Sequence, residues 1–243
     1  MIASLSRLCG PQADGPKSLY CYHSGVNNAL DNPLIGIPFS GPIKTVFLDR
    51  DGVVNEKMPE GQYVTRWDQF KILPAVPESI RLLNDAGFRV LVVSNQRGIA
   101  LGLYTSADVQ AIHAKFQNLL EAHGAHVDGF YFCPHDKDQC NCRKPLPGLF
   151  EQAQTDLPEI TAAGSAMIGD SISDIEFGRR LGMTVVFLEG DPDRQKPEAE
   201  VARELADLRF SSLHAAVTGL LARQTDQRML NGAMCLGFPA NPC

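Results

Sequence analysis

Four short stretches of the chain carry side chains suited to chemistry on an anionic group, and each one follows an apolar run. The four pairs are Asp49 and Asp51, Ser94 and Asn95, Arg143 and Lys144, and Asp170 and Asp174. A single aspartate after a strand is often only a turn or helix-cap residue. Four such stretches brought to one edge of one sheet are instead typical of an active site.

The residue types favour phosphoryl transfer assisted by a divalent cation. Two carboxylates ~4 Å apart repel by about 4 kcal/mol at an effective dielectric constant of ~20, and a cation removes that cost. Asp49, Asp51 and Asp170 offer the oxygen ligands that suit Mg²⁺. We expect Asp49 to attack phosphorus as the nucleophile and Asp51 to act first as acid and then as base. Lys144 would neutralise the phosphate and the nucleophile.

Other polar residues in these stretches have expected supporting roles. Ser94 and Asn95 can donate hydrogen bonds to phosphate oxygens, and Arg143 can bind a second phosphate or a sugar hydroxyl. Asp174, one turn into a predicted helix, is expected to orient Lys144 or a metal-bound water. A catalytically inactive phosphate-binding protein is the alternative from another functional class, but it would have no need of an acid/base carboxylate.

A second cluster of ligand-type residues lies within ten positions. Cys133, His135, Cys140 and Cys142 have the soft sulfur and imidazole donors of a closed tetrahedral Zn²⁺ site. Such a zinc would be structural, holding the loop from which Arg143 and Lys144 follow directly. The alternative is three reduced thiols beside an unrelated histidine.

Apolar runs that alternate with helical patterns predict how these residues are positioned. Strands are expected at 45–48, 88–93, 130–132, 165–168 and 184–188, with a short edge strand at 208–210. Helices are expected at 77–86, 109–123, 147–155, 172–181, 197–207 and 212–222. This order predicts an α/β fold: a doubly wound, mostly parallel, Rossmann-like sheet with helices on both faces. The connections 55–77 and 95–105 are too short for a large cap domain, so the site should be open.

Composition and charge set the class of protein. The 243 residues include 22 Lys and Arg against 28 Asp and Glu, a formal charge of −6, and 44% are hydrophobic. This argues against wholesale disorder and against a dedicated nucleic-acid or anionic-membrane binder. No segment approaches a membrane span, and a charge at Arg7 interrupts any signal-peptide core. We therefore expect a cytoplasmic monomer that acts on a small-molecule phosphate ester.

Three regions are expected along the chain. Residues 1–42 contain five Pro and five Gly without a sustained period, which predicts a poorly ordered N-terminal arm. Residues 43–223 form the predicted phosphatase domain, with the zinc loop at 133–142. Residues 224–243 are expected to be a loose C-terminal tail.

The order Asp-x-Asp-Gly, Ser-Asn, Lys and Gly-Asp-x-x-x-Asp resembles the haloacid dehalogenase superfamily of aspartyl-phosphate phosphatases, from about Val46 to Leu188. The strings Asp49–Asn55 and Cys133–Pro145 are similar to its zinc-loop branch, which includes heptose-bisphosphate and histidinol-phosphate phosphatases. The resemblance implies the roles given above, with the backbone carbonyl of Asp51 as an added Mg²⁺ ligand.

Within that branch, the segments Gly61–Val64 and Asn95–Ala100 are more similar to the heptose enzymes, which implies a heptose 1,7-bisphosphate as substrate. The alternatives are histidinol phosphate and another small phosphorylated metabolite. One departure concerns the arginine expected after Gly-Ile-Ala, because this chain has Leu101 there and Arg97 four residues earlier.

Overall fold

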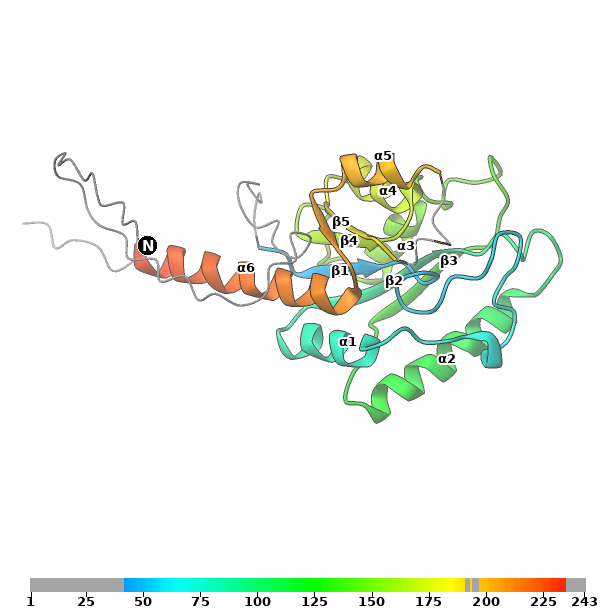
Figure 1. Ribbon diagram of the computed structural model, residues 1–243, viewed down its shortest axis with the longest axis horizontal. Coiled ribbons are helices and arrows are strands. Elements are labelled where there is room, and N and C mark those ends of the chain that lie inside the picture. Colours follow the sequence, from blue (N-terminus) through cyan, green and yellow to red (C-terminus); the bar gives the residue numbers. More distant parts are fainter. Residues whose placement is uncertain (1–41, 191–192, 194–196, 235–243) are drawn as a thin grey trace, which may run out of the picture.

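The computed structural model describes residues 42–190, 193 and 197–234. Within these residues the strands form one six-stranded sheet, in the order β3-β2-β1-β4-β5-β6, and every neighbouring pair is parallel (Figure 1). The strands are β1 Thr45–Leu48, β2 Arg89–Asn95, β3 Gly129–Cys133, β4 Ser165–Gly169, β5 Thr184–Leu188 and β6 Leu208–Phe210. The predicted parallel sheet, including its short edge strand, is confirmed.

Helices cover both faces of the sheet, as a doubly wound fold requires (Figure 1). One face carries α1 Val76–Asp85, α2 Ser106–Ala122 and α6 Leu213–Met234, whose apolar residues share the largest core cluster. The other face carries α3 Gly148–Asp156, α4 Ile172–Leu181 and α5 Ala199–Leu205. Because the central strands are buried on both faces, they are continuous apolar runs rather than alternating ones.

The helix signals in the sequence have visible local causes. A capping box begins α2: the backbone N–H of Asp108 donates to Thr105 Oγ1 at 3.2 Å, and the Thr105 N–H donates to Asp108 Oδ2 at 2.8 Å. At the end of α4, Gly182 has a φ of 78°, the left-handed conformation that favours glycine and stops the helix.

The C-terminal boundary differs from the prediction. Residues 224–234 continue α6 to Met234 instead of beginning a loose tail at 224, while 235–243 lie outside the described residues. No proline occurs between Ala222 and Met234, and the side chain of Gln224 donates to the backbone oxygen of Ile43. The helix therefore has neither a breaker nor a free end at residue 223.

The predicted N-terminal arm, 1–42, lies outside the described residues except for Pro42. Among the described connections, the one from β1 to α1 contains only a single 3₁₀ turn, η1 Trp67–Gln69, and the one from β2 to α2 contains no helix. Neither connection holds a cap domain. No helix among the described residues is long and apolar enough to cross a membrane.

Strand register aligns the ends of the central strands. Leu48 is level with Val92 on one side and with Ile168 on the other. The residues that follow these positions therefore emerge side by side at the carboxyl edge of the sheet.

Candidate active site

A buried ammonium group joins three of the predicted site regions. Lys144 Nζ lies 2.6 Å from Asp49 Oδ1, 2.6 Å from Asp174 Oδ1 and 2.8 Å from the backbone oxygen of Val93. Lys144 is only 3% exposed. The structure thus places Asp49, after β1, and Asp174, in α4, on the same lysine from the loop after β3.

Burial and neighbouring charge act in opposite directions on Asp49. Burial and the Asp174 carboxylate raise the pKa of Asp49 well above its ordinary value, although Lys144 partly opposes them. Burial by itself would lower the pKa of Lys144, but Asp174 and Asp49 outweigh that effect and raise it. The lysine therefore stays charged, and the carboxylates around it favour an added cation.

Asp51 is held by donors on both oxygens. Arg50 Nη2 donates to Oδ1 at 3.0 Å and to Oδ2 at 2.9 Å, Asn55 Nδ2 donates to Oδ1 at 2.9 Å, and Gln96 Nε2 donates to Oδ2 at 3.1 Å. Burial would raise the pKa of Asp51, but the Arg50 charge and these hydrogen bonds lower it overall. Tyr104 donates to Gln96 Oε1 at 2.8 Å and so fixes the amide orientation.

The carboxylates at this edge fit a divalent cation. One ligand oxygen from each of Asp49, Asp170 and Asp174 lies within 4.8 Å of the other two. Asp170 Oδ1 is buried without a hydrogen-bond partner, while Oδ2 is paired with Lys57 Nζ at 2.6 Å. A Cβ on Gly52 would lie 2.2 Å from Asp170 Oδ2, so glycine is required where the loop passes this carboxylate. An orphaned oxygen in a hard-ligand cluster suits Mg²⁺.

Ser94 and Asn95 are the last two residues of β2, and the structure gives each a neighbour that the sequence did not predict. Asn95 Nδ2 donates to the backbone oxygen of Lys144, and the Lys144 N–H donates to Asn95 Oδ1, both at 3.0 Å. Ser94 Oγ accepts a hydrogen bond from Gln96 Nε2 at 2.5 Å, which leaves its own proton available. Asn95 therefore positions the lysine backbone, and Ser94 retains a donor for a phosphate.

The sulfur cluster is assembled as the spacing predicts. The three Sγ atoms of Cys133, Cys140 and Cys142 are 3.1–3.4 Å apart, and His135 Nδ1 lies 3.3 Å from the Cys142 sulfur. These separations are too long for disulfide bonds, and all three thiols are free. The four donor atoms lie within 4.8 Å of one another, an arrangement compatible with a structural zinc site.

A cavity of about 420 Å³ opens in front of Asp49, Asp51 and Lys144. The cations that line it include Arg97, Lys137 and Arg143. Arg97 also bridges two loops, because its Nε donates to Asp136 Oδ1 at 2.5 Å and its Nη2 to Asp136 Oδ2 at 3.1 Å. Arg97 thus ties the loop after β2 to the cysteine loop.

The contributors to the site that were not identified from the sequence include Arg50, Gln96 and Lys57. Arg50 is 1% exposed and turns inward to hold Asp51, with its guanidinium 5.9 Å from the Phe70 ring centroid. Gln96 is equally buried, and Lys57 reaches Asp170 from 113 residues away. The position of Arg50 between two aspartates was the only local signal, and Lys57 had none.

Comparisons with known proteins agree with this geometry. The family described as HAD-hydrolase-like matches residues 141–213. The D-glycero-beta-D-manno-heptose-1,7-bisphosphate 7-phosphatase of Yersinia pestis is 37% identical over 179 residues, which cover 68% of this chain and 93% of the relative. The D-glycero-D-manno-heptose-1,7-bisphosphate 7-phosphatase of Chlorobaculum tepidum is 31% identical, with 76% and 98% covered.

A solved structure shows the same similarity. The D,D-heptose 1,7-bisphosphate phosphatase of B. bronchiseptica, complexed with magnesium and phosphate, superposes with a TM-score of 0.65 at 30% identity, covering 74% of this chain and 99% of that one. The chain therefore belongs to the haloacid dehalogenase-like phosphatases and, within them, to the heptose-bisphosphate phosphatase family.

Proposed function

We propose that the protein is a Mg²⁺-dependent phosphomonoesterase that removes the 7-phosphate of D-glycero-D-manno-heptose 1,7-bisphosphate. The observation that carries the proposal is the placement of Asp49, Asp51 and Lys144 around one cavity in a chain whose relatives are named for this reaction. Two carboxylates of unlike environment suit a nucleophile beside an acid/base group.

The reaction runs in two displacements. An Asp49 carboxylate oxygen forms a bond to phosphorus while the bond to the sugar oxygen breaks, and Asp51 gives its proton to that oxygen. Water then attacks the aspartyl-phosphate, Asp51 takes up a proton from the water, and the Asp49–phosphorus bond breaks. Inorganic phosphate leaves and both aspartates return to their starting state.

The surrounding residues make these roles physically reasonable. Lys144 holds a positive charge against Asp49 and the incoming phosphate, and Asn95 fixes its backbone. Arg50, Asn55 and Gln96 keep Asp51 oriented as a carboxylate ready for the base step. An anionic substrate beside Asp51 raises its pKa and so assists protonation for the acid step.

Asp49, Asp170 and the backbone carbonyl of Asp51 would hold the magnesium ion, with Asp174 positioning Lys144 from behind. When bound, Mg²⁺ supplies positive charge that neutralises the transferring phosphoryl group and the crowded carboxylates. Zn²⁺ in the cysteine loop would hold in place the segment that leads into Arg143 and Lys144.

The outer cavity accounts for a substrate with two phosphates. Lys137 and Arg143 line the same cavity as Lys144 and are more exposed than it, so they would meet a second anionic group of the same molecule. A sugar bisphosphate can therefore bind with one phosphate at Asp49 and the other near Arg143. Histidinol phosphate lacks that second phosphate and would not use this part of the cavity.

Phosphate release with the two heptose 1,7-bisphosphate anomers, heptose 7-phosphate, hexose bisphosphates and histidinol phosphate, ranked by kcat/KM, tests the proposal. The wild-type protein should prefer a heptose bisphosphate over heptose 7-phosphate, and Arg143→Gln should reduce that preference about tenfold. Higher kcat/KM for histidinol phosphate would contradict the proposed substrate. Phosphate binding without turnover of any ester would indicate an inactive binding protein.

A further inference from the structure

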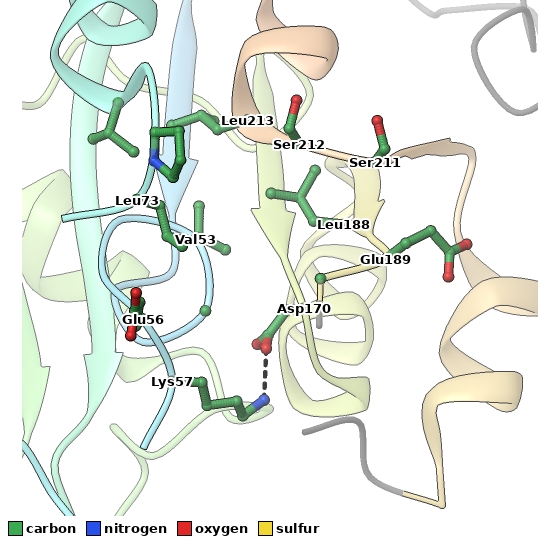
Figure 2. Close-up of a pocket in the computed structure, with 14 residues that line it drawn as sticks. Val53, Glu56, Lys57, Leu73, Asp170, Leu188, Glu189, Ser211, Ser212 and Leu213 are labelled. Carbon is green, nitrogen blue, oxygen red and sulfur yellow. Dashed lines mark hydrogen bonds and ion pairs between the residues drawn. The ribbon is translucent and has the colours of Figure 1, made fainter. Parts of the chain in front are cut away.

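Lys57 pairs with a proposed metal ligand from a loop on another part of the chain. Its Nζ lies 2.6 Å from Asp170 Oδ2, and their side chains are 20% and 10% exposed (Figure 2). Figure 2 shows the two groups facing one another across the gap between the loop after β1 and the end of β4. We propose that Lys57 is a tethered cation that competes with the metal ion for Asp170.

The competition follows from where the ammonium lies. Asp170 Oδ2 is occupied by Lys57, and Oδ1 is buried without a hydrogen-bond partner. A metal ion bound to this carboxylate and an ammonium at 2.6 Å from it would be two cations at close range, which repel strongly in a buried site. The Lys57 charge therefore opposes metal loading until its side chain moves away from Asp170.

The charge count gives Lys57 a function in the metal-free protein. Asp49, Asp170 and Asp174 contribute three formal negative charges, and Lys57 and Lys144 contribute two positive ones. The short Lys57–Asp170 contact is the geometry of an ion pair, so Lys57 offsets one of the three carboxylates. Without Lys57, the metal-free cluster would hold two uncompensated negative charges.

The two lysines of the cluster differ in burial and in the space that adjoins their side chains. Lys144 is 3% exposed and has contacts with Asp49, Asp174 and the Val93 carbonyl. Lys57 lines both the catalytic cavity and a neighbouring cavity of about 340 Å³, so its side chain has space on either side of Asp170. Lys144 is thus a permanent member of the site, and Lys57 is the displaceable one.

The surrounding backbone allows the side chain to move while its base stays fixed. The Glu56 N–H donates to the Lys71 carbonyl at 2.7 Å, and the Glu56 carbonyl accepts from Asn55 Nδ2 at 2.8 Å. The chain is therefore anchored immediately before Lys57, and only the flexible four-carbon stem has to swing.

This inference rests on the proposed metal site, so its test measures metal affinity directly. Mn²⁺ binding to the full chain is titrated by electron paramagnetic resonance for the wild type, Lys57→Met and Lys57→Arg. Lys57→Met should bind Mn²⁺ about tenfold more tightly, which corresponds to about 1.4 kcal/mol. Lys57→Arg keeps the competing charge and should bind no more tightly than the wild type. Lys115→Met, at an exposed lysine on α2, makes the same change in net charge and controls for long-range effects.

Thermal unfolding supplies a second measurement. Metal-free Lys57→Met should unfold at a lower temperature than the metal-free wild type. Saturating Mg²⁺ should raise the melting temperature of Lys57→Met by more than that of the wild type. If Lys57→Met does not fold, Lys57→Gln replaces it in both measurements. Mn²⁺ affinity in the folded variant equal to that of the wild type or of Lys115→Met would overturn the inference.

The proposed metal site can fail separately. Asp170→Asn should abolish Mn²⁺ binding in the wild-type and Lys57→Met backgrounds alike. A wild-type protein that binds no Mn²⁺ would refute both the metal site and the competition. Mn²⁺ binding that depends on Asp170 but is indifferent to Lys57 would refute the competition alone.

Discussion

Two clusters of metal-ligand type lie at the same edge of the sheet, and they differ in whether lysine side chains neutralise their ligand groups. In the oxygen cluster, Lys144 meets Asp49 and Asp174 at 2.6 Å each, and Lys57 meets Asp170 at 2.6 Å. In the sulfur cluster, the three sulfur atoms are 3.1–3.4 Å apart, and His135 Nδ1 lies 3.3 Å and 3.7 Å from two of them. Among the described residues, no lysine or arginine side chain makes a hydrogen bond to these four side chains.

The difference in neutralising cations indicates that the oxygen cluster serves turnover and the sulfur cluster serves stability. The oxygen cluster has cations of the protein's own, so the fold can persist while a metal ion and a substrate come and go. Apart from Cys133, the last residue of β3, the sulfur cluster lies in the segment between β3 and α3. This segment forms no helix or strand, so a closed metal site would supply much of its order. Changes to the first cluster should reduce turnover, and changes to the second should reduce stability.

The largest expected effect is on the nucleophile. Asp49→Asn should lower phosphate release at least about 10⁴-fold, because an amide cannot form the aspartyl-phosphate. Its melting temperature should stay within a few degrees of the wild type. Asp85→Asn, at an exposed aspartate paired with Arg81, is the matched control and should leave phosphate release unchanged. Mg²⁺-dependent turnover that survives in Asp49→Asn would remove Asp49 from its role.

A substitution of one cysteine ligand tests the sulfur cluster. Cys142→Ser should lose bound zinc, lower the free energy of unfolding by about 3 kcal/mol and reduce activity roughly 10- to 100-fold, because Lys144 lies two residues further along. Zinc analysis and thermal unfolding measure these effects. Asp138→Asn alters an exposed residue of the same loop that is not a ligand and should change neither. Full zinc content in Cys142→Ser would contradict the assignment.

A substitution of Gln96 distinguishes support of the acid/base role of Asp51 from a general packing role. Gln96→Leu removes the 3.1 Å hydrogen bond to Asp51 and should lower kcat for the sugar phosphate about 10- to 100-fold. With p-nitrophenyl phosphate, whose leaving group needs no proton, the loss should be within about threefold. Tyr104→Phe deletes only the 2.8 Å bond to Gln96 and should have a smaller effect with the same pattern. Equal losses for both substrates would indicate a packing defect.

A histidine outside both clusters has the smallest expected effect. His113 is 4% exposed, and burial followed by the Arg50 charge lowers its pKa to about 3. Below pH ~6.5 the unfolded chain binds a proton at this histidine that the folded protein does not bind. The free energy of unfolding therefore falls by about 2 kcal/mol by pH 5.

His113→Leu should therefore lose less stability between pH 7 and pH 5 than the wild type, as measured by urea unfolding at the two pH values. His123→Leu, at the exposed residue that follows α2, the helix that contains His113, should keep the wild-type pH dependence. An unchanged pH dependence in His113→Leu would show that His113 protonates in the folded protein.

The sequence was most informative where ligands or elements are local. Cys133, His135, Cys140 and Cys142 fall within ten residues, so spacing alone brought the set together. Five strands were visible as apolar runs, and the ends of three of these runs pointed to Asp49, Ser94 and Asp170. The start of the loose tail was expected too early, at 224, because α6 continues to Met234.

What the sequence by itself determined is the class of the protein: a doubly wound parallel sheet with carboxylates, a lysine and a sulfur cluster after its strands. Hydrophobic period and strand-end position are properties of neighbouring residues, and they can be read along the chain. Only the tertiary structure decided which partner each polar group has. Arg50 turns inward to Asp51, Asn95 holds the backbone of Lys144, and Lys57 faces Asp170, because side-chain direction in a loop depends on packing between segments far apart in sequence.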